Sequence, residues 1–341
     1  MKIRRLLLTV FVVAATLVGC GTPDIDTDAK EIKFGEATTR AEVDSADDIL
    51  EFKVFAEMNL GADGTAEASQ WIPILENERV YRTSTSSPFI YDHTRYWVEN
   101  RKFNFFAVYP YDTAVTVNDN GSGNDSYSIH YTTPETADLD FLYASKPQKT
   151  EVAQSEYPTV TFELQHITSK IKFEITRDGN NNQMDKFLVD SVKISYVKKS
   201  GTVTVSPTNT QGSWVSDDET LNFTKKYSTP EEIGLNGDPK VSDKLTPWED
   251  GLLVMPQSVQ SRQIMFQIFY QYQVDGNNPG VTNPATPEKK EITAWLPAIE
   301  WASNSSYLYK LTLKETNLIT FSQIEVAGWG SNITGGTIII K

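Results

Sequence analysis

Few side chains in this chain of 341 residues are of types that commonly carry chemistry. It has one cysteine, Cys20, and three histidines, His93, His130 and His166, which lie far apart in the sequence. A lone cysteine cannot form a disulfide within the chain, and the histidines have no partners at metal-ligand spacing. No zinc-protease, paired C-x-x-C, nucleophile-elbow or P-loop motif occurs. The sequence therefore predicts no catalytic residue, no metal site and no cofactor, and a structural role for His166 among its apolar neighbours.

The residues before Cys20 have the order of a bacterial export signal. Basic residues open the chain, residues 6–18 are almost uninterruptedly apolar, and Gly19 is a small residue just before the cysteine. The apolar run is too short to span a bilayer as a helix but fits a signal peptide. Its end resembles a lipobox, in which the cysteine is acylated (for example with palmitate) and becomes the first mature residue. We predict a lipoprotein signal peptide over residues 1–19 and lipidation of Cys20; the alternative is an ordinary signal peptide with an incidental cysteine.

The charge and composition of the chain exclude some classes of partner. The formal net charge is -14, and loss of the three basic residues of the signal lowers it by three, to -17. Such a charge argues against binding to nucleic acid or to an anionic membrane surface. Hydrophobic residues make up 39% of the chain, which is enough to build a core. The sequence thus predicts a folded protein without a nucleic-acid partner.

An alternation of apolar and polar residues dominates the chain after residue 30. In LEFKVFAEM (50–58), Phe52 and Val54 point to one side, and Lys53 and Glu57 point to the other. The same period recurs in KIKFEIT, SVKISYV and YLYKLTLK, and clusters of Gly, Asn, Pro and Asp separate these segments. Strands of this kind bury one face and expose the other to water. The pattern predicts an all-β protein built from antiparallel sandwiches.

A polar segment, SKPQKTEVAQSEYP (145–158), divides an aromatic-rich half of the chain from a half rich in Thr and Val. We interpret it as a domain boundary. The organisation is then a tether over residues 20–30, an N-terminal β-sandwich over 31–155 and a C-terminal β-sandwich over 156–341. A long surface loop within one domain is the competing interpretation.

The seven tryptophans of the chain have two common uses in β-proteins. Indole rings pack in cores and at sandwich edges, and they also provide flat apolar surfaces for ligands such as sugars. Trp295 in EITAWLP points away from the apolar side that carries Ile292, Ala294 and Leu296. Trp295 is therefore the candidate glycan contact, with edge packing as the alternative.

Seven stretches, in order along nearly the whole chain, carry a resemblance to a known family. They are IKFGEATTRAEV (32–43), FNFFAVYPYD (103–112), DFLYAS (140–145), VTFELQHITSKIKFEI (160–175), LLVMPQS (252–258), EWASNSSYLYKLTL (300–313) and ITFSQIEVAGWG (319–330). Together with the lipobox they resemble fimbrillins, the Mfa-like subunits of the type V pili of Bacteroidetes. No single stretch is diagnostic, but the set in this order is specific.

The resemblance implies a fold, a location and a mode of assembly. It implies two tandem transthyretin-like β-sandwich domains with Greek-key-type antiparallel sheets, and export as a lipoprotein to the cell outer membrane, exposed at the surface. An arginine-directed protease then cuts after an early strand, here between Arg40 and Ala41, which removes the lipid with the strand and exposes a groove. A C-terminal strand of a neighbouring subunit fills that groove. The implied partners are other pilus subunits in a homo- or hetero-polymer, the protease, and the outer membrane through lipidated Cys20.

The C-terminal tail supplies a candidate donor strand over residues 337–341. Two glycines form a hinge before Thr337, Ile338, Ile339 and Ile340. Three consecutive isoleucines suit a strand that is buried on both faces. The alternative is that the tail completes its own domain.

These observations lead to one interpretation and one competitor. We interpret the protein as a non-enzymatic structural subunit of a pilus, or fimbrium, that supports cell adhesion and assembles by protease-triggered strand exchange. The competitor is a glycan-binding surface lipoprotein of the outer membrane that does not polymerise. The sequence does not distinguish stalk, tip and anchor subunits, because an anchor of this family keeps both its lipid and its first strand.

Overall fold

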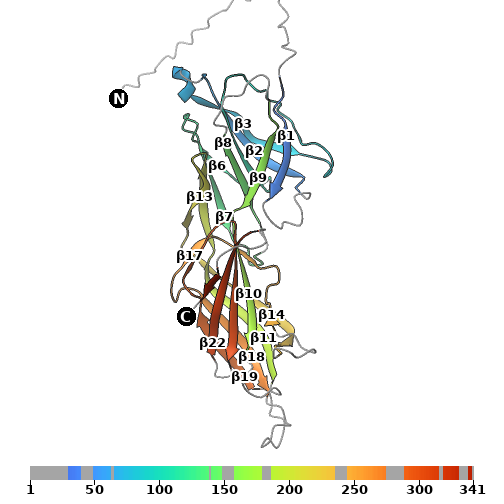
Figure 1. Cartoon of the computed structure of the whole chain (residues 1–341), viewed down its shortest axis with the longest axis vertical. Helices are drawn as coiled ribbons and strands as arrows, with labels where there is room; N and C mark the ends of the chain where they lie inside the picture. Colours follow the sequence, from blue (N-terminus) through green and yellow to red (C-terminus); the bar gives the residue numbers. More distant parts are fainter. Residues whose placement is uncertain are drawn as a thin grey trace, which may run out of the picture.

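The computed structural model describes residues 30–35, 49–62, 65–137, 140–147, 157–178, 186–234, 244–272, 288–314 and 318–329, and the backbone of 36–39, 273 and 337–339. These residues form β-strands β1 to β23 and one short 3₁₀ helix, η2 (Ala66–Ser69). The sheets are stacked in two groups along the long axis of the molecule (Figure 1). The all-β class predicted from the alternation of apolar and polar residues is confirmed.

The upper sheets in Figure 1 consist of a seven-stranded and a four-stranded sheet. The larger contains β1 (Phe34–Thr39), β2 (Glu51–Asn59), β3 (Trp71–Tyr81), β4 (Ile90–Tyr91), β5 (Phe103–Tyr109), β8 (Leu142–Pro147) and β9 (Val160–His166). Their order is β1-β9-β8-β5-β2-β3-β4. The smaller, in the order β13-β12-β7-β6, contains β6 (Thr116–Asn118), β7 (Ser126–Thr132), β12 (Ser200–Ser206) and β13 (Asn209–Ser216). A shared apolar cluster, which includes Phe106 and Ile129, joins the two sheets face to face.

The lower sheets enclose the largest apolar core, in which Phe173, Ile194, Phe266 and Tyr309 meet. One sheet contains β10 (Ser169–Arg177), β15 (Lys244–Leu245), β16 (Leu252–Val254), β21 (Ser305–Lys314), β22 (Leu318–Gly328) and β23 (Thr337–Ile339). The opposing sheet, in the order β14-β11-β18-β19, contains β11 (Lys186–Lys198), β14 (Thr220–Glu232), β18 (Met265–Gln273) and β19 (Glu288–Trp295). A two-stranded ribbon pairs β17 (Gln257–Val259) with β20 (Ile299–Trp301).

Two strand pairs among the described residues are parallel, which the expectation of antiparallel sheets did not include. They are β1 with β9 in the upper sheets and β10 with β21 in the lower sheets. The remaining pairs are antiparallel. A parallel pair needs a long connection, and here the intervening strands of the fold provide it. The transthyretin-like description of the two groups stays a prediction.

The pairing of the strands changes where a domain boundary can lie. β9 pairs with β8 and β1, and β12 pairs with β7. A division between residues 155 and 156 therefore separates strands that are hydrogen-bonded to one another. The chain leaves the upper sheets between Ile167 and Thr168 and returns to them for the β12–β13 hairpin. The boundary between residues 155 and 156 stays a prediction. The strand pairing leads us to propose residue 167 as an alternative boundary between two domains, because backbone pairing couples segments that are distant in sequence.

The central strands of the large upper sheet are buried on both faces. The alternation predicts that Lys53 and Glu57 face water, but they are only 9% and 2% exposed. Phe52 and Val54 pack in one apolar cluster, whereas Phe55 on the opposite face packs against β7 and β12. The second face is covered because the four-stranded sheet, which comes from later in the chain, lies against it. The Nζ of Lys53 remains satisfied by donating to the carbonyl of Thr113 at 2.7 Å.

Candidate functional site

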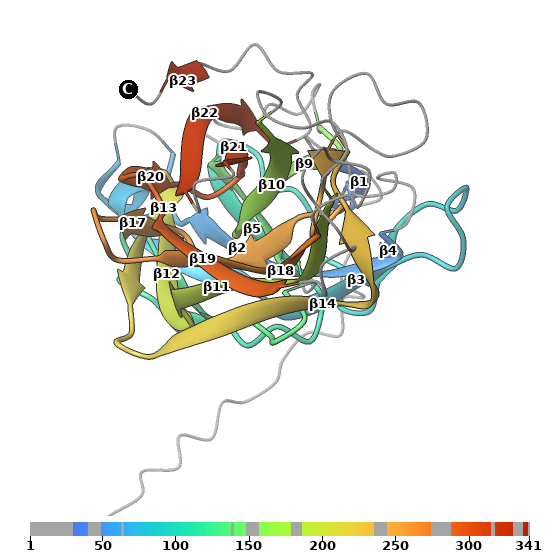
Figure 2. The same ribbon diagram turned by 90° about the horizontal axis from the view of Figure 1, so that it is seen from below.

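The first strand, β1, lies at the edge of the large upper sheet. It pairs in parallel with β9, with Phe34 opposite Val160 and Ala37 opposite Phe162. Just before the strand, the N–H of Val160 donates to the carbonyl of Lys33 at 2.8 Å. Figure 2, which looks along the long axis, also shows β1 beside β9. One side of the first strand is therefore held by a backbone ladder, which has a register shift between Phe34 and Ala37.

The residues that precede β1 are held on their other side by segment 91–97. The N–H of Ile32 donates to the carbonyl of Arg95 at 2.8 Å, and the N–H of Trp97 donates to the carbonyl of Lys30 at 2.9 Å. The phenol of Tyr91 donates to the carbonyl of Ile32 at 2.8 Å. Residues 30–39 thus occupy a strand-shaped slot. Segment 91–97 borders it along residues 30–32, and β9 borders it along β1, whose other edge has no neighbouring strand among the described residues. We call this strand-shaped slot the β1 slot.

Two apolar side chains anchor residues 30–39 in the core. Ile32 is fully buried, and Phe34 is 4% exposed. The ring of Phe34 meets Tyr91 edge-on, with ring centroids 5.2 Å apart, and stacks with Phe162 at 6.1 Å. Phe105 contacts the same ring edge-on at 6.3 Å. Removal of residues 30–39 exposes this aromatic floor and leaves backbone groups of β9 without partners, which is the geometry of a strand-accepting groove.

The residues predicted for lipidation and processing, Cys20, Arg40 and Ala41, lie outside the described residues. β1 ends at Thr39, so the predicted cut follows one residue after the end of the strand. After such a cut, the β1 slot would keep residues 30–39 only through the backbone and side-chain contacts described above.

The predicted donor strand forms β23, and Ile340 lies outside the described residues. β23 pairs antiparallel with β22 at the end of its sheet, with Thr337 opposite Glu325 and Ile338 opposite Ile324 (Figure 2). In this conformation the tail pairs with its own chain. Within the described residues β23 has a single neighbouring strand, so few hydrogen bonds hold it.

The chain reaches this tail from a stacked aromatic pair. Trp329 lies on the ring of His166, with ring centroids 3.8 Å apart and planes 3° apart. The Nδ1 of His166 is 2.5 Å from Oδ2 of Asp140, and the N–H of Trp329 donates to the carbonyl of Asn304 at 3.0 Å. His166 is fully buried in this arrangement, which agrees with a structural role. The stack fixes the point from which the tail starts.

A buried carboxylate, Glu57 on β2, lies on the face of the seven-stranded sheet that is opposite the aromatic floor of the β1 slot. Glu57 accepts a hydrogen bond from Nδ2 of Asn104 at 2.8 Å. Burial is the largest influence and raises the pKa of Glu57 to about 7; the Asn104 bond opposes it, and the nearby Asp125 and Asp119 add to it. Within the described parts of the chain, no group of three or more His, Cys, Asp or Glu side chains is arranged to hold a metal ion.

The raised pKa of Glu57 predicts a pH-dependent stability. The ordinary value is 4.5, so the folded state binds this proton more tightly than the unfolded chain does. The resulting stabilisation is complete below pH 4.5 and is lost as the pH rises through about 7. Glu57→Gln should therefore flatten this fall in unfolding free energy and stabilise the chain near pH 8 by up to about 3 kcal/mol. Urea unfolding near pH 5 and pH 8 measures both effects.

A matched control for Glu57→Gln is Glu76→Gln, which changes an exposed carboxylate on the neighbouring strand β3. The Glu76 variant should keep the pH dependence of the unmodified chain. If the unfolding free energy of Glu57→Gln also keeps this pH dependence, Glu57 is not the group whose titration causes it.

The sequence pattern did not indicate that segment 91–97 borders the start of the β1 slot. Tyr91, Arg95 and Trp97 carry no strand period, and their partners Lys30 and Ile32 lie some sixty residues earlier in the chain. The available signal was the alternation of Ile32 with Phe34, which marks an apolar face but not what covers it. The slot exists only because the fold brings these segments together.

Comparison with known proteins identifies the family. A family model described as fimbrillin-like matches residues 39–329. The chain belongs to the fimbrillin-like family. The match confirms the resemblance drawn from the seven stretches. The match begins at Thr39, so nearly all of residues 30–39, which fill the β1 slot, lie just before the matched range of this fimbrillin-like chain.

A solved structure from a Bacteroides species has the same fold. A fimbrial protein from Bacteroides vulgatus is 17% identical with a TM-score of 0.65, covering 88% of the fimbrillin-like chain and 99% of its own. A protein described as a candidate for cell adhesion, from Bacteroides ovatus, is 15% identical with a TM-score of 0.49, covering 89% and 99%. Among proteins with curated functions, none matches. Among the described residues of this fimbrillin-like chain, no helix has the length and apolar character needed to cross a membrane.

Proposed function

We propose that this chain is a pilus subunit that is exported as a lipoprotein to the cell outer membrane and assembles by strand exchange after a cut at Arg40. Membership in the fimbrillin-like family supports a structural role at the cell surface. The observation that carries the mechanism is the β1 slot. Its occupant bonds segment 91–97 through residues 30–32 and pairs with β9 along β1, is anchored by Ile32 and Phe34, and ends at Thr39, just before Arg40.

The β1 slot explains why a replacement strand would bind. Burial of a phenylalanine or isoleucine side chain contributes about 1.5–3 kcal/mol, and the slot buries one of each. An emptied slot would therefore expose apolar surface and unpaired backbone, both of which a donor strand covers. The tail fits this requirement because successive side chains of a strand point to opposite faces. With Ile338, Ile339 and Ile340 in sequence, either face of the tail presents isoleucine to the aromatic floor.

The β1 slot offers a donor strand two kinds of contact. In its own chain the tail is bonded along one edge, through the three pairs of β22 with β23. In the β1 slot a donor strand would pair along β9 and cover the aromatic floor beneath it. The slot of a neighbouring subunit therefore offers the tail both backbone pairing and an apolar surface.

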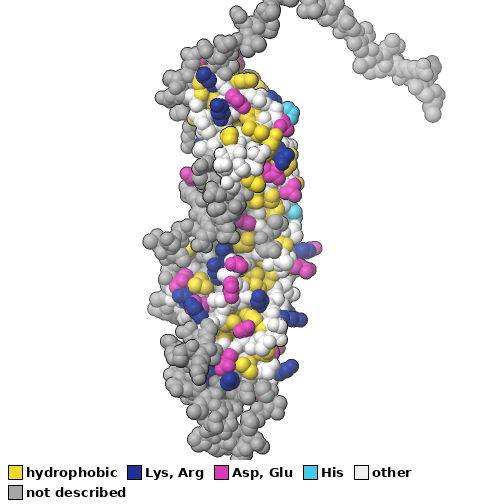
Figure 3. Space-filling view, turned by 90° about the vertical axis from the view of Figure 1, so that its right-hand side faces the viewer, with side chains coloured by type: hydrophobic (Ala, Val, Ile, Leu, Met, Phe, Trp, Pro, Cys, Tyr) yellow, Lys and Arg dark blue, Asp and Glu magenta, His cyan; other side chains and the backbone are white. Residues whose placement is uncertain are grey.

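Attachment of the precursor to the membrane is assigned to the acyl chains on Cys20. On the face shown in Figure 3, Lys and Arg side chains are interspersed with Asp and Glu, without a large field of one sign. A strongly acidic chain of this kind has little electrostatic attraction to anionic lipid headgroups. Acyl chains contribute about 0.8 kcal/mol per buried CH₂, so a multiply acylated cysteine is sufficient as an anchor.

Deletion of residues 337–341 tests the proposed function. The truncated chain should form no polymer, because no donor strand is left, but it should remain a folded monomer. Electron microscopy and light scattering of processed protein measure assembly, and circular dichroism reports the fold. The matched control replaces Ile338, Ile339 and Ile340 by valine, which keeps the β-branched pattern and should still polymerise. Polymers of the truncated chain would show that the tail is not the donor.

A further inference from the structure

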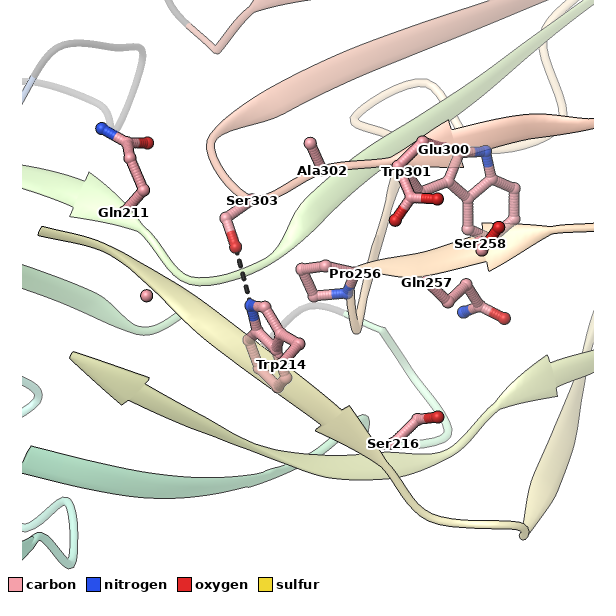
Figure 4. A pocket seen from close by; sticks show the side chains of 11 residues that line it. Gln211, Trp214, Ser216, Pro256, Gln257, Ser258, Glu300, Trp301, Ala302 and Ser303 are labelled. Atoms are coloured by element: carbon pink, nitrogen blue, oxygen red, sulfur yellow. Dashed lines mark hydrogen bonds between the residues drawn. The ribbon is translucent and has the colours of Figure 1, made fainter. Parts of the chain in front are cut away.

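A cavity of about 470 Å³ lies where the upper and lower sheets meet. One wall comes from β13, and the other comes from the β17–β20 ribbon and the residues that follow β20 (Figure 4). Its volume falls within the range of about 300–1,000 Å³ that is common for ligand sites. The cavity lies away from the β1 slot and shares no residue with it.

Trp214 gives the cavity a fixed aromatic surface. The indole is half-buried and packs in part against the core between the two upper sheets. Its Nε1 donates to the hydroxyl of Ser303 at 2.8 Å, a bond that runs from β13 to the residues after β20 (Figure 4). Because the ring is held at its packed side and at its nitrogen, it needs no reordering to accept a ligand.

Polar groups face the same space from the ribbon. Ser258 and Glu300 lie directly opposite each other on β17 and β20, so their side chains project from the same face. Both residues are exposed, whereas their neighbours Gln257 and Trp301 are buried beneath them. Glu300 makes no ion pair with any other described residue, so its carboxylate is available to accept hydrogen bonds from a ligand. The hydroxyl of Ser258 accepts from Gln260 at 2.6 Å and keeps its own proton to donate.

We propose that this cavity binds a neutral sugar unit of a glycan. A pyranose ring has an apolar C–H face, which suits the indole of Trp214, and a rim of hydroxyls, which suits Glu300 and Ser258. The lining contains no lysine or arginine, so it offers nothing to a phosphate, sulfate or sialic-acid carboxylate. Serines, glutamines and one glutamate make up much of it, which is a poor environment for a purely apolar ligand. This binding function goes beyond the pilus role and does not rest on strand exchange.

The test measures binding of the full chain to a panel of neutral oligosaccharides built from glucose, galactose, mannose and N-acetylglucosamine, with sialylated oligosaccharides alongside. Calorimetry on the strongest neutral ligand should give a Kd of about 1 mM or tighter. Glu300→Ala should weaken this binding about tenfold, and Trp214→Ala should weaken it at least as much. Because Glu300 is exposed on a strand, its variant keeps the test valid if Trp214→Ala does not fold. Glu76→Ala, which removes an exposed carboxylate from β3, should bind as the unmodified chain does.

Four results would overturn the proposal. They are the absence of any neutral ligand at about 1 mM, unchanged affinity in both cavity variants, binding restricted to sialylated ligands, and loss of affinity with Trp295→Ala alone. The last result would place the sugar at the edge of β19, where Trp295 is 41% exposed. Chains that lack residues 337–341 should bind the sugar normally, so failure of assembly and failure of sugar binding are separate outcomes.

Discussion

Replacing Arg40 by alanine should leave the chain as an uncut, lipid-bearing monomer when the unmodified chain is processed and polymerises. The expected reason is that the β1 slot stays filled. Residues 30–39 remain joined to the rest of the chain, so their effective concentration at the slot is far above that of a donor strand from another subunit, and the donor cannot displace them. N-terminal sequencing should find Ala41 as the first residue of assembled unmodified protein. Mass spectrometry should find acylated Cys20 at the start of the variant.

Two further variants sharpen the Arg40 experiment. Arg40→Lys keeps the positive charge but not the guanidinium, so an arginine-directed protease should leave it uncut as well. Arg262→Ala removes another exposed arginine, in the turn before β18, and should be processed and assembled normally. Assembly of Arg40→Ala in normal yield would show that loss of the first strand does not drive polymerisation.

Replacing Phe34 by alanine should lower the free energy of unfolding of the uncut chain by about 3–5 kcal/mol. The ring is almost fully buried and contacts Tyr91, Phe105 and Phe162, so its removal leaves a cavity lined by rigid aromatic side chains. Urea unfolding followed by tryptophan fluorescence measures the change. Lys33→Ala, at the exposed preceding position, should shift stability by less than about 0.5 kcal/mol.

The Phe34 result is informative whether or not Arg40 is cut. A loss in unfolding free energy of less than about 1 kcal/mol would mean that residues 30–39 contribute little to the upper core. A slot that gains little stability from the strand it holds would not select a donor strand. A large loss would establish the aromatic floor as the feature that a donor must satisfy. In processed protein the same substitution should also release the cut strand faster.

Local patterns in the sequence were sufficient for the class of the fold and for the family. Strand alternation depends only on neighbouring residues, so KIKFEIT and YLYKLTLK correctly predicted β10 and β21. The same pattern could not reveal that these two strands pair in parallel, because nothing in either segment specifies its partner. It also misplaced Lys53 and Glu57 in water, since burial of the second face depends on a sheet formed later in the chain.

By itself, the sequence determined the strand character of most segments and membership in the fimbrillin-like family, and it predicts an export signal before Cys20 and a cut at Arg40 beyond the first strand. Only the tertiary structure decided that β1 pairs with β9, that Tyr91 and Trp97 bond the residues before β1, and that Trp214 and Glu300 share a cavity. The physical reason is the range of the interactions. Propensity and periodicity act between neighbours, whereas pairing and face coverage depend on which distant segments exclude water together.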